Sequence, residues 1–311
     1  MSDQAEPLRR LMQKQPTDPH QRMKGIDPKD TQRSRIIGWA SGKGGVGKSN
    51  LVLSLSYALS EVGRRVLLID ADAGFGNLSL LMGEGQTADL MDVIEGRKHL
   101  QEVLVQTSGG FYYTSFAGTL EAFLASEDQE KVGKIETILQ QLEGFGDVIL
   151  LDFGAGLSSL ARHVLAAVDE LVLVITPEVT ALSDAYVLYK WLYQSRQDPS
   201  VHVLVNRVQE EKEAEAIFTR FERIAFKYLG GAPKYLGFVR EDPHVPQAVK
   251  RQVPFYMAYP RSAASRDIQH IRARLRLHWN MCDGDDTTEH VKGGMRGLLE
   301  RLKGLVKRGE V

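Results

Sequence analysis

The segment Gly42-Lys43-Gly44-Gly45-Val46-Gly47-Lys48-Ser49 follows an apolar run at residues 36–40 and precedes an apolar stretch at 51–59 that can form a helix. It fits the pattern G-x-x-x-x-G-K-[ST], whose glycines let backbone N–H groups approach phosphate oxygens at a helix N-terminus. A strand before the loop and a helix after it distinguish such a site from an ordinary glycine-rich turn. The sequence therefore predicts a nucleotide-binding loop that extends to Asn50.

The two lysines of this loop have different expected roles. Lys48 is placed to reach the β- and γ-phosphates of ATP, and the hydroxyl of Ser49 is placed to ligate Mg²⁺. Lys43, by contrast, is not needed to build the loop. Its presence requires another explanation.

Composition restricts the class of protein. The chain has 311 residues, of which 43% are hydrophobic, enough for one large α/β domain or two small ones. The formal net charge is −1, so contact with nucleic acid would need a local basic patch. The single cysteine, Cys282, excludes an intramolecular disulfide framework and favours a reducing cytoplasm. No apolar run is long enough to span a membrane, and the N-terminus has no signal-peptide core.

Apolar runs of strand length alternate with segments of helical pattern. The strand-like runs are 36–40, 66–69, 111–116, 147–151, 171–175, 201–205 and 235–239, and the helix-like segments are 50–62, 128–143, 157–167, 181–195, 211–229 and 261–280. Strands rich in Val, Ile and Leu indicate burial on both faces of a sheet. The alternation predicts an α/β fold with a doubly wound, mainly parallel sheet of about seven to eight strands.

Polar side chains follow several of these strands. Asp70 and Asp72 come after the second run, Asp152 ends the fourth, and Asn206-Arg207 follows the sixth. Open α/β sheets bind ligands at the carboxyl ends of their strands. We expect Asp70 and Asp152 to act on Mg²⁺, and the Asn206 amide to hydrogen-bond a purine.

Both ends of the chain differ from the middle. Residues 1–35 are polar and predict a flexible extension, 36–280 form the predicted catalytic domain, and 281–290 read as a linker. Segment 291–311 predicts an amphipathic helix with a basic face, which is typical of membrane-surface binding. A helix packed on the domain's own surface or in a dimer is the alternative. The residues expected to enter the membrane are Met295, Leu298, Leu299, Leu302, Leu305 and Val306.

These motifs together resemble a known family. KGGVGKS with the additional lysine, D-A-D-x-G at 70–74, D-x-G-A-G at 152–156 and N-R at 206–207 look like the deviant-Walker-A ATPases of the MinD/ParA type, a SIMIBI-class P-loop fold. Segments 71–78, 89–96 and 258–265 are similar to the flagellar FlhG/FleN branch, which controls flagellar number and placement. The resemblance covers residues 36–280.

The resemblance implies roles for the site residues. Lys43 would reach across an ATP-dependent homodimer to the partner's phosphates, in the manner of an arginine finger. Asp72 would position the attacking water. Phe153 stands where relatives often carry Thr or Ser, and Ser49 replaces the commoner Thr.

The resemblance also implies partners. Asp3-Gln4-Ala5, followed by Leu8 to Met12, is similar to the motif with which the family stimulates its GTPase partner FlhF. Flagellar basal-body or regulatory proteins and an anionic membrane surface are further expected partners. The expected location is the cytoplasm, peripherally on the inner face of the cell membrane.

Other functions remain open at this point. A MinD- or ParA-type ATPase that positions the division site or segregates DNA is the main alternative. Nucleic acid is not an expected partner, although a patch of arginines leaves DNA binding to be tested: Arg266, Arg272, Arg274 and Arg276. A nucleotide-gated scaffold without catalysis is a third alternative. An iron-protein reductase is excluded because one cysteine cannot hold a cluster.

Overall fold

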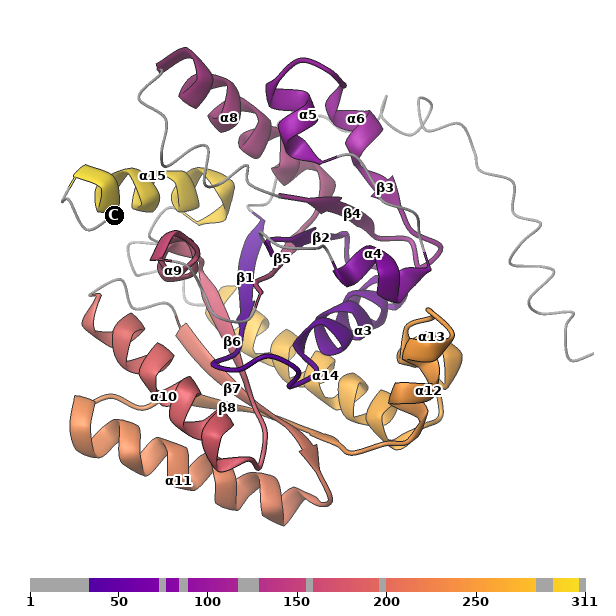
Figure 1. The fold of residues 1–311 in the computed structure, drawn as a ribbon, viewed down its shortest axis with the longest axis vertical. Helices are drawn as coiled ribbons and strands as arrows, with labels where there is room; N and C mark the ends of the chain where they lie inside the picture. The colour runs from indigo at the N-terminus through magenta and orange to yellow at the C-terminus, as the bar shows by residue number, and fades with distance from the viewer. Residues whose placement is uncertain are drawn as a thin grey trace, which may run out of the picture. The chain divides into compact units, whose positions relative to one another are not determined.

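The computed structural model describes residues 34–72, 77–83, 89–116, 129–154, 159–195, 200–283 and 293–307. The predicted partner motif Asp3-Gln4-Ala5 lies outside these ranges, as does most of the predicted linker 281–290. Within them, eight strands form one sheet in the order β3-β4-β2-β5-β1-β6-β7-β8 (Figure 1). The strands are β1 (Arg35–Ala40), β2 (Val66–Asp70), β3 (Val105–Gln106), β4 (Tyr112–Ser115), β5 (Val148–Asp152), β6 (Glu170–Ile175), β7 (Ser200–Val208) and β8 (Lys234–Arg240).

The pairing is parallel throughout except between β3 and β4. This confirms the predicted doubly wound, mainly parallel sheet. The antiparallel strand β3 was not predicted, because a strand of two residues carries no periodic signal.

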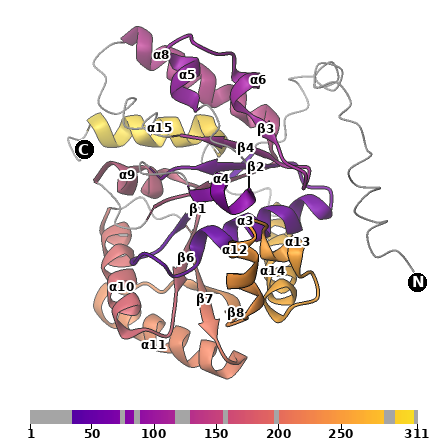
Figure 2. The same ribbon diagram turned by 45° about the vertical axis from the view of Figure 1, so that its right-hand side comes forward.

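Helices cover both faces of the sheet (Figures 1 and 2). Neighbouring strand residues point to opposite faces, so Ile36 and Ile149 join one apolar core whereas Ile37 and Leu150 join the other. The first core is closed by α5 (Leu90–Ile94), α6 (Leu100–Val103), α8 (Gln129–Leu142), α9 (Ser159–Ala167), α10 (Val179–Gln194), α11 (Glu211–Leu229) and α15 (Gly294–Lys307). The second is closed by α3 (Lys48–Glu61), α4 (Asn77–Met82), α12 (His244–Lys250), α13 (Phe255–Ala258) and α14 (Ala263–Asp283).

The C-terminal helix α15 packs on the domain. Met295, Leu298 and Leu302 are fully buried and Leu299 is nearly so, against α8 and α9. Of the arrangements considered from the sequence, packing on the domain's own surface is the one found in this structure. The side chains of Leu305 and Val306 lie outside the described part of the chain.

Polar contacts fix α15 at its start and near its middle. A Glu143 carboxylate oxygen accepts hydrogen bonds from the backbone N–H groups of Met295 and Arg296 at the start of the helix. Arg301 donates from Nη2 to Asp169 Oδ1 over 2.8 Å and from Nε to the Ala167 carbonyl. The helix is therefore docked by both apolar packing and charge. None of the helices among the described residues has the length and apolar character needed to cross a bilayer.

Candidate nucleotide-binding site

The predicted phosphate loop borders a large cavity at the carboxyl ends of the central strands. Its volume is about 1010 Å³, sufficient for a nucleotide. The lining includes residues 44–50 of the loop, Asp72 of the next βα connection, Gly154, Asn206, Arg207 and apolar residues such as Val239 and Phe255. The structure thus gathers residues from distant parts of the sequence around the loop.

The glycines of the loop are required by its shape. Gly47, which precedes α3, has φ of 89°, and a Cβ there would lie 2.6 Å from Asn206 Nδ2. A Cβ on Gly42 would lie 2.3 Å from backbone atoms of α10. Any larger residue would displace the loop from the helix and strand that hold it.

Lys48 forms a buried ion pair with Asp152 at the end of β5. The same ammonium lies 3.4 Å from Ser49 Oγ. Burial raises the pKa of Asp152, because this effect outweighs the attraction of Lys48. The expected phosphate-binding lysine and metal-binding acid are therefore neighbours in this structure.

Asp70 lies beside Asp152, since the two residues pair in register across β2 and β5. Its carboxylate accepts hydrogen bonds from the N–H groups of Asp72 (3.1 Å) and Leu78 (3.4 Å). Burial, and next the Asp152 carboxylate, raise the pKa of Asp70 to about 6. Two carboxyl groups held together without a counter-charge for both make a pocket suited to a cation.

The donor set fits Mg²⁺ with a nucleotide phosphate. Ser49, Asp70 and Asp152 offer hydroxyl and carboxylate oxygens, the ligands that Mg²⁺ prefers. Asp72 lies close by: a Cβ on Gly154 would fall 2.4 Å from Asp72 Oδ1. The carboxylate of Asp72 is thus placed at the edge of the cavity, where water can reach it.

Lys43 is turned away from the cavity of its own chain. Its ammonium lies 2.7 Å from Glu178 Oε2 and 3.3 Å from Thr180 Oγ1, at the start of α10. The hydrogen bond from Lys43, and then its charge, lower the pKa of Glu178. The sequence analysis did not identify Glu178, although its position just after β6, at the same edge of the sheet, was a signal for it.

Asn206 contacts the phosphate loop in this structure. Its Nδ2 donates to the Val46 carbonyl over 2.7 Å, and the residue is buried. The register between β7 and β8 shifts here, and Arg207 has φ of 61°, which residues other than glycine rarely adopt. Such a bulge re-aims side chains. In this structure the Asn206 amide holds the phosphate loop, while the exposed Arg207 borders the cavity.

Three of the four arginines in the patch on α14 form hydrogen bonds within the domain. Arg266 donates to the Arg261 carbonyl, Arg272 to the Ala58 carbonyl and Glu61, and Arg274 to the Leu236 carbonyl. These contacts give those three arginines a structural role.

Comparisons with known proteins agree with this geometry. A family model described as the CobQ/CobB/MinD/ParA nucleotide binding domain matches residues 37–255. The chain is 33% identical over 268 residues to the antiactivator FleN of Pseudomonas aeruginosa, covering 86% of this chain and 93% of that protein. It is 28% identical over 273 residues to the flagellum site-determining protein YlxH of Helicobacter pylori, covering 86% and 90%.

Among solved structures, the septum site-determining protein MinD of Pyrococcus horikoshii, complexed with Mg-ADP, superposes with a TM-score of 0.62 at 25% identity. The match covers 80% of this chain and 98% of that one. The chain belongs to the MinD/ParA family of P-loop nucleotide-binding ATPases, and FleN and YlxH are among its relatives.

Proposed function

We propose that the protein is a Mg²⁺-dependent ATPase, converting ATP and water to ADP and phosphate, that forms a homodimer when ATP is bound. The observation that carries this proposal is the position of Lys43. Its ammonium is held by Glu178 and does not line the cavity, so one of the two lysines of the loop is left without a contact to a nucleotide bound in its own chain. A second chain, docked face to face, would bring its own Lys43 to the phosphates.

Each site residue has a role in this scheme. Lys48 would donate to the β- and γ-phosphates, and Ser49, Asp70 and Asp152 are the residues that would hold the metal. Asp72 orients the attacking water. Mg²⁺ supplies neutralisation of phosphate charge when bound. Lys43 of the second chain stabilises charge that develops on the transferred phosphoryl group.

Light scattering with a parallel assay of phosphate release tests this function. The wild-type chain should be a dimer with ATP and a monomer with ADP. Asp72→Ala should remain dimeric with ATP, because the nucleotide binds but is not hydrolysed. If Asp72→Ala dissociates as the wild type does, hydrolysis does not drive the cycle and a non-catalytic scaffold is the better description.

We further propose that this cycle controls flagellar number and placement. The support is the relationship to YlxH and FleN together with the segments at 71–78, 89–96 and 258–265. Flagellar counts after deletion of the gene are the test. Displaced septa with normal flagella would favour the division-site function of a MinD, and salt-dependent retardation of DNA would favour a ParA function.

Membrane association is the second part of the proposed cycle. The apolar face of α15 is buried in the domain, so it has to leave α8 and α9 before it can enter a bilayer. Two such helices in one dimer bind with an avidity higher by about 10²–10⁴ than one. Sedimentation with anionic vesicles should require ATP, and a chain ending at residue 290 should stay in solution. Unchanged binding by that shortened chain would disprove this part.

The N-terminal motif suggests a separate activity. We propose that Asp3, Gln4 and Ala5 stimulate an FlhF-like GTPase. A peptide of residues 1–20 should accelerate GTP hydrolysis by that partner, and a Gln4→Ala peptide should not. Equal stimulation by the two peptides would remove the proposal.

A further inference from the structure

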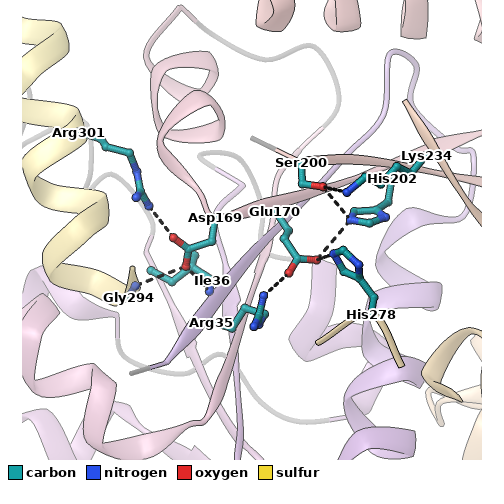
Figure 3. A network of polar contacts seen from close by, with 10 residues as sticks. All are labelled: Arg35, Ile36, Asp169, Glu170, Ser200, His202, Lys234, His278, Gly294 and Arg301. Carbon is teal, nitrogen blue, oxygen red and sulfur yellow. Dashed lines mark hydrogen bonds and ion pairs between the residues drawn. The ribbon is translucent and has the colours of Figure 1, made fainter. Parts of the chain in front are cut away.

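A second cluster of chemically competent side chains lies at the opposite edge of the sheet. Glu170 begins β6, His202 lies near the start of β7, and His278 reaches them from α14 (Figure 3). The nucleotide cavity is at the carboxyl ends of the strands, so this cluster at their amino ends is separate from it. The proposed ATPase cycle makes no use of it.

Three potential ligand atoms converge in the cluster. His202 Nε2 lies 3.4 Å and His278 Nε2 lies 3.9 Å from Glu170 Oε2, and all three ligand atoms are within 4.8 Å of one another. Ligands bonded to Zn²⁺ at about 2.0–2.1 Å in a tetrahedral site are separated by about 3.4 Å. A small rotation of the His278 ring would therefore give the required spacing.

The Glu170 carboxylate has an unused acceptor. Only 3% of the residue is exposed, and Oε2 accepts no hydrogen bond from the described residues. Its other oxygen, Oε1, accepts from Arg35 Nη1 over 2.7 Å, which fixes the orientation of the group. A buried acceptor without a donor is costly, so each one in a folded protein calls for an explanation.

We propose that Glu170, His202 and His278 bind a divalent transition-metal ion of the Zn²⁺ class. Two imidazole nitrogens and one carboxylate oxygen favour Zn²⁺, Co²⁺, Ni²⁺ or Cu²⁺ over Mg²⁺ and Ca²⁺, which prefer oxygen ligands. The fourth coordination position is left to water. The side chain of His278 is 26% exposed and provides the route of entry.

Two members of the cluster, His278 and Glu170, have shifted pKa values. Burial lowers the pKa of His278, which makes it a neutral ligand. Burial alone would raise the pKa of Glu170, but the contacts with His202 and Arg35 lower it to about 2, so this carboxylate is ionised.

The charged groups around the cluster affect how tightly it can bind a cation. Arg35 contacts Oε1 of Glu170, and Lys234 Nζ lies 3.2 Å from Ser200 Oγ, which itself lies 3.2 Å from His202 Nε2. The positive charges of Arg35 and Lys234 oppose the binding of a metal cation. Ser200 also has to give up its contact with His202 Nε2 before that nitrogen can bind the metal. Asp169, adjacent to Glu170, is engaged by Arg301 and the Ile36 N–H. We therefore expect weaker binding than at a fully anionic site.

Equilibrium dialysis of Zn²⁺ against the full chain is the test, with excess Mg²⁺ and ADP to saturate the phosphate-loop site. We expect one Zn²⁺ per wild-type chain and at least tenfold weaker binding for His278→Ala and for Glu170→Gln. His270→Ala is the matched control, because His270 is exposed on the same helix. Cys282→Ser should also bind normally, which separates this site from binding by the only thiol.

A spectroscopic measurement keeps the test independent of folding defects. Co²⁺ added to the wild-type chain should give visible absorption bands of nitrogen and oxygen ligation, absent from His278→Ala with an unchanged circular dichroism spectrum. Binding that is unaffected by His278→Ala, or lost in Cys282→Ser, would overturn the proposal. No Zn²⁺ retained by the wild type would overturn it as well.

Discussion

The ammonium of Lys43 lies 2.7 Å from Glu178 Oε2 of the same chain, and this contact holds the lysine outside the cavity that its own loop borders. Both side chains are substantially exposed, 43% for Lys43 and 55% for Glu178. Water and salt screen such a pair, so the lysine can leave it at little cost. The contact is therefore compatible with a lysine that exchanges between Glu178 and a second chain.

Replacing Lys43 should separate nucleotide binding from turnover. We expect Lys43→Ala to bind ATP as the wild type does, because Lys48 and the loop backbone remain. Its ATP hydrolysis should fall by about 10²–10³-fold and its ATP-dependent dimer should be lost, since one donor to the developing charge is missing. Fluorescent-nucleotide titration and single-turnover hydrolysis measure the two effects.

Glu178→Gln is the matched variant for that experiment. It should keep full hydrolysis and form the dimer at slightly lower ATP concentration. The reason is that an uncharged side chain at position 178 holds Lys43 less strongly within its own chain. A Lys43→Ala chain that still pairs and turns over normally would reduce the protein to a monomeric nucleotide binder.

The raised pKa of Asp70 predicts a dependence of stability on pH. Asp70 binds its proton more tightly when folded, so the folded state loses stability as the pH rises from 3.8 to about 6, and the loss persists above that. Asp70→Asn removes this loss but gives up the hydrogen bond from Leu78, worth about 1 kcal/mol. We expect the variant to gain about 1–2 kcal/mol above pH 6.

Below pH 3.8 the wild type should be the more stable of the two. Its Asp70 carboxyl is then protonated, so the variant differs only in lacking the hydrogen bond from Leu78. Urea unfolding across this pH range measures the effect. A stability difference that does not change with pH would show that burial of the Asp70 charge is not its cause. The same variant should lose Mg²⁺-dependent hydrolysis.

A substitution at Asn206 can show whether this residue supports the phosphate loop or recognises the base of the nucleotide. Its amide donates to the Val46 carbonyl, so Asn206→Ala should weaken binding of ATP and GTP alike. Loss of a buried hydrogen bond of about 1–1.5 kcal/mol corresponds to about a five- to tenfold loss of affinity. Titration with both nucleotides decides: a change in the ratio of the two affinities would mean that Asn206 reads the base.

Glu143 is predicted to control how firmly α15 is docked. It accepts hydrogen bonds from the first N–H groups of the helix, and removal of such a cap costs about 1 kcal/mol. Glu143→Ala should therefore speed amide hydrogen exchange in residues 294–307 by about fivefold and increase vesicle binding without nucleotide. Glu215→Ala, an exposed acid on α11, is the control for the change in charge.

Slow exchange that persists in Glu143→Ala would mean that apolar packing alone fixes the helix. In that case Leu298→Ala, which leaves a cavity costing about 2–5 kcal/mol, is the stronger probe of docking. Vesicle binding that rises equally in Glu215→Ala would point to charge alone.

Local patterns predicted much of the fold. The phosphate loop lies between β1 and α3 as expected, and α11 occupies the predicted range, with acids in its first turn, Lys227 in its last turn and Gly230 in the left-handed conformation after it. Helix periodicity and capping are properties of neighbouring residues, which is why they can be read from a single sequence. The short helices α4, α5, α6, α12 and α13 were not predicted, because so few turns carry little periodic signal.

By itself, then, the sequence determined the loop, the strand before it and the helix after it, and the acids Asp70 and Asp152 at the ends of two other strands. Only the tertiary structure decided that the apolar face of α15 packs on α8 and α9, that Asn206 supports the loop, and that Glu170, His202 and His278 converge. Amphipathicity specifies that a face is buried but not what covers it. Contacts between residues distant in the chain depend on strand order, which no local pattern encodes.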